Sequence, residues 1–300
     1  MNYKLRNYLL LLLVLLLFAQ CDQKQNKSKT SSTSETELQQ FFKYTGDSSI
    51  IISGHRGNWR NSSYPDNSLE GLIYVTEHVP DVFFEIDPRL TKDSVIVLMH
   101  DATLERTTDG QGKLNEYTWE ELQDIRLKDS EGNITQYRIP TLEEVIRWSI
   151  GKTVLDLDRK DVPPSMIVEL IKKCEAEHTI MLTVHTGEQA RFYYDQLPNV
   201  MLSARIRDEN ELDDFANSGV PWDNMIAYIG QTINEENREL VDKLHNLGLR
   251  CMIALSPTHD RLETAEERAE AYREEISRGP DIIETDYPVE VWKVLNDMRE

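Results

Sequence analysis

The recurrence of short apolar strands between helical segments is the feature that most constrains the fold of this chain. Eight apolar, often β-branched runs occur, and helical patterns such as Ser165 to Ala176 and Glu235 to Leu247 separate most of them. The runs are Ile50 to Ser53, Val82 to Asp87, Thr153 to Asp158, Ile180 to Val184, Met201 to Arg205, Met225 to Ile229, Arg250 to Leu255 and Asp281 to Thr285. Eight such units in about 250 residues match an α/β fold of the (β/α)8 TIM barrel type, with an open doubly wound sheet as the alternative.

A ninth apolar run, Val95 to Met99, does not fit the alternation of strands and helices. Only Arg89 to Ser94 separates it from the second strand, which is too short for a parallel crossover but suits a β-hairpin. An antiparallel return would bring His100 back to the level of Glu85 and Asp87. The sequence therefore predicts a hairpin that extends the second barrel strand, and the number of parallel strands stays at eight.

The segment after this hairpin, residues 102–138, has many turn residues and little β pattern. A short helix over Trp119 to Asp124 is the regular element that we expect in it. The sequence thus predicts a small insertion over the mouth of the barrel, within a catalytic domain that covers residues 41–300.

Two acidic residues on the second strand predict a cation near the carboxyl end of the barrel. Glu85 and Asp87 are two positions apart, so both side chains point to the same side of a strand. Two unpaired carboxylates inside a fold lose solvation and repel each other, so a positive charge has to lie between them. A divalent metal with oxygen ligands is one solution, and a structural ion pair with arginine or lysine is the other.

Eight short motifs occur in the order in which one enzyme family has them. They are His55-Arg56-Gly57, Pro65-Asp66-Asn67-Ser68, Glu85-Ile86-Asp87, His100-Asp101, Arg106-Thr107-Thr108-Asp109-Gly110, Ile139-Pro140-Thr141-Leu142-Glu143-Glu144, Asp158-Arg159-Lys160 and Thr285-Asp286-Tyr287-Pro288. Together they resemble the glycerophosphodiester phosphodiesterase family, and the resemblance runs from Ile51 to Val289. It implies a TIM barrel with a small subdomain and hydrolysis of a small-molecule glycerophosphodiester to glycerol 3-phosphate and an alcohol.

The same resemblance implies roles for seven residues. His55 and His100 would be the general acid and base, Glu85, Asp87 and Asp158 would bind the metal, and Arg56 and Lys160 would bind the phosphate. These residue types suit the reaction, since histidine titrates near neutral pH and can either take or give a proton. Carboxylate oxygens suit hard cations, so the expected cofactor is Ca²⁺ or Mg²⁺.

Two departures from the family pattern concern this site. Asp158 stands where the family usually has the longer glutamate, so the metal would shift, a water would intervene or Asp156 would contribute. In an alternative interpretation, Lys160 only neutralises Asp158. Ala254-Leu255-Ser256 replaces a tryptophan-bearing segment of many relatives, which leaves the glycerol contacts open.

Two further polar residues follow strands and need an interpretation. His185 comes directly after a strand, and we expect it to be available as a substrate contact. Asp286 closes the last of the eight motifs, and we expect it to serve the loop architecture rather than catalysis.

The N-terminal residues have the pattern of an exported lipoprotein. Two basic residues precede an uncharged apolar run, Tyr8 to Ala19, which is too short to span a bilayer and is typical of a secretory signal. Cys21 follows directly, as in a bacterial lipoprotein, so residues 1–21 are predicted to be a signal peptide with Cys21 lipidated. Residues 22–40 are rich in polar residues and are predicted to be a flexible tether. We therefore expect a cell-envelope lipoprotein that contacts the membrane through its lipid anchor.

The charge of the chain restricts its partners. Beyond residue 40 the chain has 28 basic and 50 acidic residues, a formal charge of −22. Such a surface argues against nucleic acid and against electrostatic adhesion to anionic lipid. Cys174 and Cys251 have no disulfide or metal-binding spacing, so we expect buried thiols. No protein partner is evident from the sequence.

Two other functions stay open at this point. One is a phospholipase-type phosphodiesterase acting on lysolipids or lipids, which needs an apolar groove at the mouth and could use Trp59, Tyr64 and Trp119. The other is a barrel that has lost catalysis and serves as a surface binding protein. The intact pair of histidines argues against that second alternative, and the departures at Asp158 and Ala254 are what would favour it.

Overall fold

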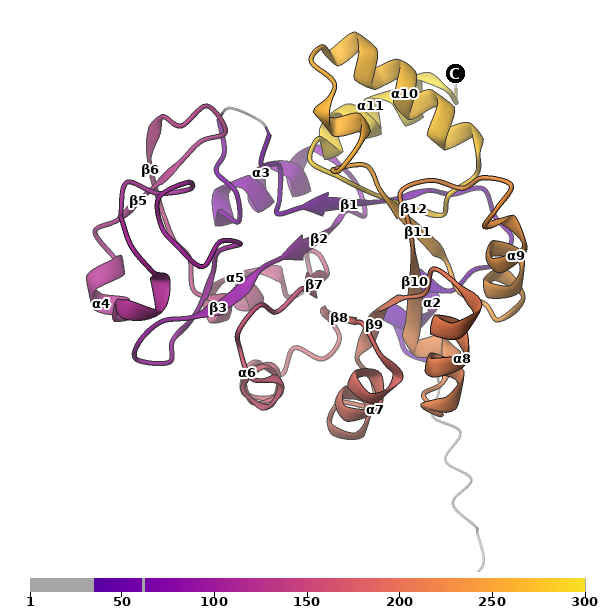
Figure 1. Ribbon diagram of the computed structural model, residues 1–300, viewed down its shortest axis with the longest axis horizontal. Coiled ribbons are helices and arrows are strands. Elements are labelled where there is room, and N and C mark those ends of the chain that lie inside the picture. The colour runs from indigo at the N-terminus through magenta and orange to yellow at the C-terminus, as the bar shows by residue number, and fades with distance from the viewer. Residues whose placement is uncertain (1–34, 61–62, 300) are drawn as a thin grey trace, which may run out of the picture. The chain divides into compact units, whose positions relative to one another are not determined.

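Eight parallel strands close into a barrel in the computed structural model, which describes residues 35–60 and 63–299 (Figure 1). The strands are β1 (Ile51–His55), β2 (Phe83–Ile86), β7 (Leu155–Leu157), β8 (Ile180–Val184), β9 (Met201–Arg205), β10 (Met225–Gly230), β11 (Cys251–Ala254) and β12 (Ile282–Thr285). Each strand pairs with its neighbour in parallel register, and β12 pairs with β1 to close the sheet. The predicted TIM barrel is confirmed, and the open sheet is excluded.

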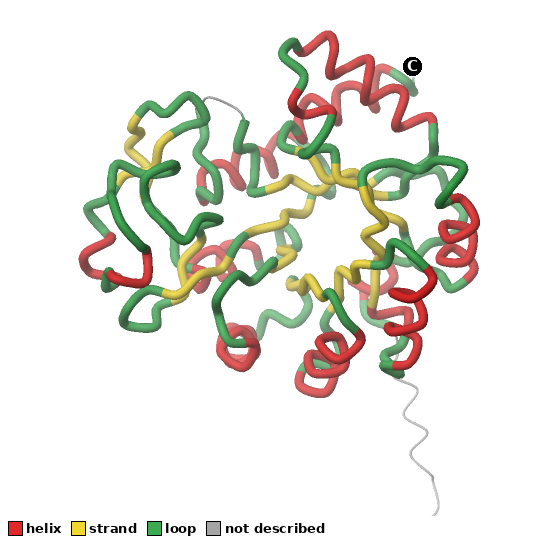
Figure 2. Tube along the Cα trace, viewed as in Figure 1, coloured by secondary structure: helices red, strands yellow, loops and turns green. Residues whose placement is uncertain are grey.

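Helices follow the barrel strands and form an outer ring around them (Figure 2). They are α3 (Leu69–His78), α5 (Leu142–Ser149), α6 (Pro164–Cys174), α7 (Gly187–Gln196), α8 (Glu209–Asn217), α9 (Arg238–Asn246), α10 (Ala265–Ser277) and α11 (Pro288–Asp297). Most begin at a side-chain cap, as at Ser68, Thr141 and Thr264, whose hydroxyls accept a hydrogen bond from the backbone N–H three residues on. Their apolar faces cover the outside of the barrel and exclude water from the strands. None of the helices in the described ranges is long and apolar enough to cross a bilayer.

The inside of the barrel has an apolar lower layer. It is formed by inward-pointing side chains of the strands, among them Ile51, Phe83, Met181, Met201, Ile226 and Ile282. Successive residues on a strand point to opposite faces, so the residues two positions further along point inward at the next level up. That next level is polar, as in Ser53 on β1 and Glu284 on β12. The inside of the barrel is therefore apolar at its lower end and polar at the level above.

A short helix, α2 (Glu37–Phe42), closes the lower end of the barrel and corrects the predicted tether of residues 22–40. Thr36 caps the helix with a capping box, and Leu38 and Phe42 are buried in the apolar lower layer. These side chains lie on one face of the helix because they are four residues apart. Since they pack into the barrel, the folded domain begins at about Thr36 rather than at residue 41. The predicted signal peptide and Cys21 lie outside the described residues.

The predicted hairpin after the second barrel strand is present. β3 (Pro88–Leu90) pairs antiparallel with β4 (Ile96–Leu98), and the backbone N–H of Met99 donates to the carbonyl of Asp87. His100 therefore returns to the level of Asp87, as the hairpin geometry requires.

The insertion differs from its prediction in two respects. Besides a 3₁₀ turn at Leu114–Glu116 and α4 (Trp119–Leu122), it contains a second hairpin, β5 (Arg126–Lys128) with β6 (Ile134–Arg138). It also lies beside the barrel rather than over its mouth (Figures 1 and 2). The reason is its own apolar cluster, which includes Leu104, Leu122 and Leu127 and gives it an independent small core.

Candidate active site

Three carboxylates meet at the carboxyl ends of β2 and β7. Glu85 is at the inward face of β2, Asp87 follows two residues later, and Asp158 follows β7 directly. One carboxylate oxygen of each lies within 4.8 Å of the others. Glu85 and Asp87 are 7% and 0% exposed, and Glu85 Oε2 has no hydrogen-bond partner among the described residues. A buried oxygen without a partner, next to two further carboxylates, fits a hard divalent cation.

The pKa values of Glu85 and Asp87 are shifted in opposite directions. Burial and the neighbouring charge of Asp87 raise the pKa of Glu85 well above its ordinary value. Burial would do the same to Asp87, but Lys160 and Arg56 hold its pKa below the ordinary value. Asp87 thus forms the ion pairs of the structural alternative. Glu85 forms no ion pair with lysine or arginine among the described residues, so a cation beside it would stabilise its charged form.

The two expected phosphate partners both contact Asp87. Lys160 Nζ lies 2.7 Å from Asp87 Oδ1 and also contacts the carboxylate of Asp158. Arg56 Nε lies 3.3 Å from Asp87 Oδ2, and Arg56 Nη1 lies 3.4 Å from Asp66 Oδ2. Lys160 therefore does neutralise Asp158, as the alternative interpretation states, while its contact with Asp87 places it at the centre of the site.

Asn67 also holds Asp87, and sequence reasoning assigned it no role. Its side-chain amide donates to Asp87 Oδ2 at 2.7 Å, and its carbonyl oxygen accepts from the backbone N–H of Asp87 at 3.0 Å. Its backbone is in the left-handed region, with φ 56°, which asparagine tolerates better than most residues. Its position in the second of the eight motifs was the available signal.

His55, at the end of β1, is paired with Asp286 rather than standing alone. Its Nδ1 lies 2.6 Å from Asp286 Oδ1, and its Nε2 lies 3.8 Å from Glu85 Oε2. Asp286 also accepts hydrogen bonds from Trp59 Nε1 and, at 2.6 Å, from Arg60 Nε. Burial opposes ionisation of His55, but the hydrogen bond with Asp286 and the charge of Glu284 raise its pKa.

The expectation that Asp286 serves the loop architecture rather than catalysis stays a prediction, but the structure shows that Asp286 also contacts His55. Asp286 lies 231 residues from His55 in sequence, but β12 is the barrel neighbour of β1, with Thr285 paired to Gly54. The loops that follow these two strands are therefore adjacent. The signal that could have revealed the contact was the closure of the barrel between its first and last strands.

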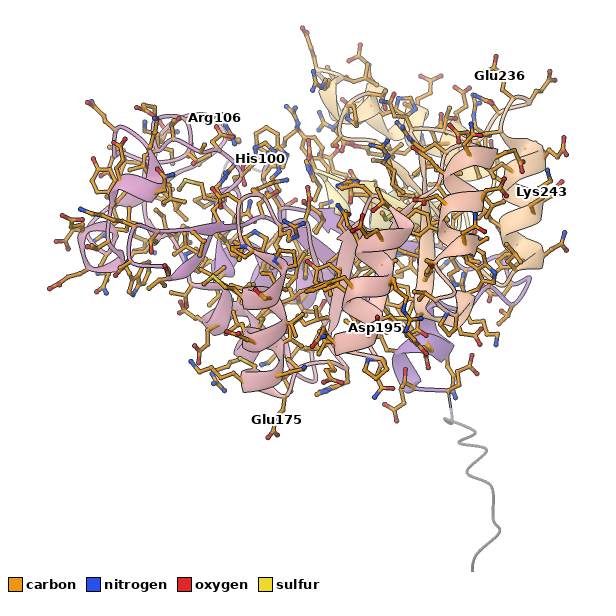
Figure 3. The ribbon with its side chains drawn as sticks, turned by 60° about the horizontal axis from the view of Figure 1, so that its bottom comes forward. His100, Arg106, Glu175, Asp195, Glu236 and Lys243 are labelled. Atoms are coloured by element: carbon orange, nitrogen blue, oxygen red, sulfur yellow. The ribbon has the colours of Figure 1, made fainter. Side chains whose placement is uncertain are left out.

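His100 is paired with the residue next to it. Its Nδ1 lies 2.8 Å from Asp101 Oδ1, and Arg106 holds Asp101 through hydrogen bonds of 2.6 and 2.9 Å. Arg106 lowers the pKa of Asp101. Figure 3 shows His100 where the insertion meets the barrel, with Arg106 further onto the insertion. All seven residues predicted for the site are thus gathered around Glu85 and Asp87.

A cavity of about 180 Å³ opens at the barrel mouth beside the carboxylates. His55, Glu85 and Asp158 form one side of it, and His185 lines it as expected. Asp156, which the sequence offered as a possible contributor beside Asp158, also lines it, and so does Glu284, which the sequence did not single out. Burial raises the pKa of Asp156 to about 7, although Thr183 Oγ1 donates to it at 2.9 Å.

The three aromatic residues considered for an apolar groove lie in different surroundings. Trp59 donates to Asp286 and lies under the guanidinium of Arg60, Tyr64 stacks on Tyr74 with ring centroids 4.7 Å apart, and Trp119 packs on the core of the insertion. Ten of the eleven residues that line the mouth cavity have polar or charged side chains, and Met252 is the exception. The geometry therefore suits a polar substrate better than a lipid chain.

Comparison with known proteins places these features in one family. Residues 55–253 match the family described as the glycerophosphoryl diester phosphodiesterase family. A crystal structure of a glycerophosphoryl diester phosphodiesterase from Parabacteroides distasonis is 52% identical, with a TM-score of 0.84 over 87% of this chain and 91% of that one. A glycerophosphodiester phosphodiesterase of Caldanaerobacter subterraneus is 37% identical over 97 residues, which span 32% of this chain and 38% of that relative.

A more distant structure shares the fold. The Oleispira antarctica phosphodiesterase, solved in complex with the product sn-glycerol-3-phosphate, is 19% identical with a TM-score of 0.63, over 82% of this chain and 96% of that one. At this identity the likeness concerns the barrel alone.

Proposed function

The chain belongs to the glycerophosphoryl diester phosphodiesterase family, and from this premise we propose that it hydrolyses glycerophosphodiesters to glycerol 3-phosphate and an alcohol. The observation that carries the proposal is a pair of histidines near the acidic cluster, each with its own carboxylate. His55 lies 3.8 Å from Glu85, and His100 follows Met99, whose backbone N–H donates to Asp87. The 52% identity with the Parabacteroides distasonis glycerophosphoryl diester phosphodiesterase supports this class of reaction here.

In this proposal the acidic cluster holds a divalent cation, Ca²⁺ or Mg²⁺. Glu85, Asp87 and Asp158 are the residues that would bind it, since they offer only oxygen ligands. When bound, the cation supplies positive charge to the phosphate oxygens in the transition state. Lys160 and Arg56 add fixed positive charge on the same side, because both contact Asp87.

The two histidines move the protons of the reaction. One of them takes the proton of the attacking oxygen, and the other gives a proton to the departing alcohol. Asp286 binds Nδ1 of His55, so Nε2 is the atom that faces the site, and Asp101 acts in the same way on His100. The carboxylates fix the tautomer and orientation of the rings and stabilise their protonated form.

The test is release of glycerol 3-phosphate from glycerophosphocholine and glycerophosphoethanolamine by the full chain. We expect release with Ca²⁺ or Mg²⁺ and loss of release with a chelator. His55→Ala, His100→Ala and Glu85→Ala should each lower kcat by at least about 10²-fold. Glu263→Gln, which removes an exposed carboxylate outside the mouth cavity, is the matched control. Absence of release with every metal would contradict the proposal.

We further propose that residues 1–21 export the chain and that Cys21 carries its lipid anchor, so that the enzyme works at the cell envelope. The support is the sequence pattern of a short apolar run followed directly by cysteine. Labelling with a radioactive fatty acid tests this. Wild type should take up label and remain with membranes, whereas Cys21→Ser should do neither, and labelling of both would contradict the anchor.

A further inference from the structure

A histidine, a cysteine and an aspartate meet at the lower end of the barrel, and the proposed reaction uses none of them. His245 lies near the end of α9, Cys251 is the first residue of β11, and Asp281 directly precedes β12. One ligand atom of each residue lies within 4.8 Å of the other two. Because β11 and β12 are parallel neighbours, their amino ends meet at the end of the barrel opposite to the carboxylates of the mouth.

Hydrogen bonds and stacking fix two of these three side chains. Asp281 Oδ2 accepts from the backbone N–H of Cys251 at 2.7 Å and lies 2.8 Å from His245 Nε2. The ring of His245 stacks on Tyr44, with centroids 3.7 Å apart and planes inclined by 5°. The backbone N–H of Tyr44 donates to the carbonyl of Gly248 at 2.9 Å, so the segment after α2 is attached here. The carboxylate and the imidazole are therefore held in place before any ligand binds.

The thiol of Cys251 is the third group, and it is buried without a partner. Cys251 is 0% exposed, and its sulfur forms no disulfide and no hydrogen bond with residues 35–60 or 63–299. Burial and the charge of Asp281 raise the pKa of this thiol well above its ordinary value, so the thiol keeps its proton. A cation bound beside it would favour the thiolate instead, and the proton would leave to solvent.

The mixture of ligand atoms indicates which ion fits. Sulfur and imidazole nitrogen together with one carboxylate suit Zn²⁺, whereas Ca²⁺ and Mg²⁺ take oxygen ligands. A tetrahedral Zn²⁺ ion with bonds of about 2.0 to 2.3 Å separates its ligand atoms by about 3.3 to 3.8 Å. Atoms that already lie within 4.8 Å of one another each have to move by less than about 1 Å. The side chain of His245 is 18% exposed, so an ion can enter and water can take the fourth position.

We propose that His245, Cys251 and Asp281 bind a structural Zn²⁺ ion. The ion takes the place of the thiol proton of Cys251 and connects α9 to the amino ends of β11 and β12. Since Tyr44 stacks on His245, the ion also fastens the segment that follows α2 to the barrel. The site is independent of the proposed function, because the proposed catalytic groups lie at the opposite end of the strands.

Co²⁺ binding to the full chain tests this proposal. Co²⁺ can replace Zn²⁺ in such sites, and it gives a strong near-ultraviolet charge-transfer band when a thiolate binds it. The acidic cluster at the mouth offers only oxygen atoms, so Co²⁺ bound there gives no such band. We expect reduced wild type, with excess Mg²⁺ present, to develop the band until it saturates, and excess Zn²⁺ to abolish it.

Variants assign the band to these residues. Cys251→Ser should abolish it, and His245→Gln should weaken Co²⁺ binding about tenfold or more. Cys174→Ser and Cys21→Ser are the matched controls, since they remove the other two cysteines and should keep the band. Circular dichroism checks that each variant is folded, and His245→Gln carries the test if Cys251→Ser does not fold. Zn²⁺ should also raise the Tm of wild type and not that of Cys251→Ser.

The outcomes separate this inference from the proposed function. A wild type without the band overturns the inference, as does a band that Cys251→Ser retains or that Cys21→Ser loses. The three residues would then be a hydrogen-bonded pair beside a buried thiol. Release of glycerol 3-phosphate is measured independently, so either proposal can fail while the other holds.

Discussion

The barrel and the hairpin that leads into the insertion each place one histidine near the acidic cluster, and they do so in opposite ways. His55 and Asp286 come from the first and last strands, 231 residues apart, and their side chains are only 14% and 1% exposed. His100 and Asp101 are neighbours in sequence, and their side chains are 35% and 27% exposed. The first pair exists only when the barrel is closed, whereas the second depends on a local turn. In the proposed function, the site therefore has one histidine–carboxylate pair shielded from solvent and one that solvent and salt reach.

The largest expected loss of activity comes from changing Asp286, the carboxylate of the buried histidine pair. In Asp286→Asn the contact with His55 Nδ1 loses its negative charge, so the imidazole is no longer held in one tautomer or stabilised when protonated. We expect kcat to fall on the order of 10²-fold, with a changed pH profile. Steady-state kinetics across pH is the measurement. A normal profile with a kcat within about threefold of wild type would remove Asp286 from the proton transfer.

A second prediction concerns Asp260, which lies behind Asp286. Asp260 accepts hydrogen bonds of 2.6 Å from the backbone N–H of Asp286 and from the hydroxyl of Tyr272. Burial raises its pKa from 3.8 to about 6. Its protonated form is thus favoured in the folded state, so its contribution to stability is complete below the unfolded pKa and is lost as the pH rises through the folded pKa.

Replacement of Asp260 by asparagine should remove this dependence. The free energy of unfolding of wild type relative to Asp260→Asn should fall by about 2 kcal/mol between pH 4 and pH 7. Urea denaturation of both proteins at several pH values checks it. A difference that stays constant with pH would show that Asp260 titrates normally and that this side of the site is more open than its burial indicates.

The exposed pair should respond less to the equivalent substitution. Asp101→Asn should lower kcat by about tenfold, because solvent can replace part of the interaction with His100. Asp195→Asn, which removes the carboxylate of an exposed ion pair with Arg191 on α7, is the control for a general effect of lost charge. A loss as large as that of Asp286→Asn would mean that the two pairs are equivalent despite their different exposure.

The smallest expected effect is that of Arg106, which holds Asp101 from the insertion. The side chain of Arg106 is 42% exposed, so Arg106→Gln should lower kcat/KM by about threefold. Added salt should shrink the difference between wild type and variant, since it screens exposed charges. Kinetics at low and high ionic strength measures this. An effect that salt does not change would place the pair in a less solvated environment.

The barrel and the core of the site could be predicted because their signals are local. Each strand is an apolar run of a few residues, and Glu85, Asp87 and Asp158 lie directly at strand ends, which parallel β/α barrels bring to one face. The hairpin that places His100 followed from the short connection before Val95. In these cases the residues come close because of strand direction and loop length, and both can be read from the sequence.

The parts that could not be predicted depend on contacts between distant segments or on weak patterns. The contact of Asp286 with His55 requires knowledge of which strands close the barrel. Glu284 lies in an otherwise ordinary apolar strand, and only the direction of its side chain makes it part of the cavity. The strand Ile134–Arg138 was missed because its side chains are exposed or half-exposed throughout. Its sequence therefore lacks the alternation of apolar and polar residues that predicts a strand.

The apolar floor of the barrel, completed by Phe42 of α2, leaves the cavity above it with an opening at the mouth and a closed base. Because the cavity opens only at the mouth, a product bound at its base has to leave before the next substrate can enter. On the proposed function, we therefore expect glycerol 3-phosphate to be a competitive inhibitor and turnover to slow as it accumulates. The rate of hydrolysis would then depend on how fast a further reaction removes this product.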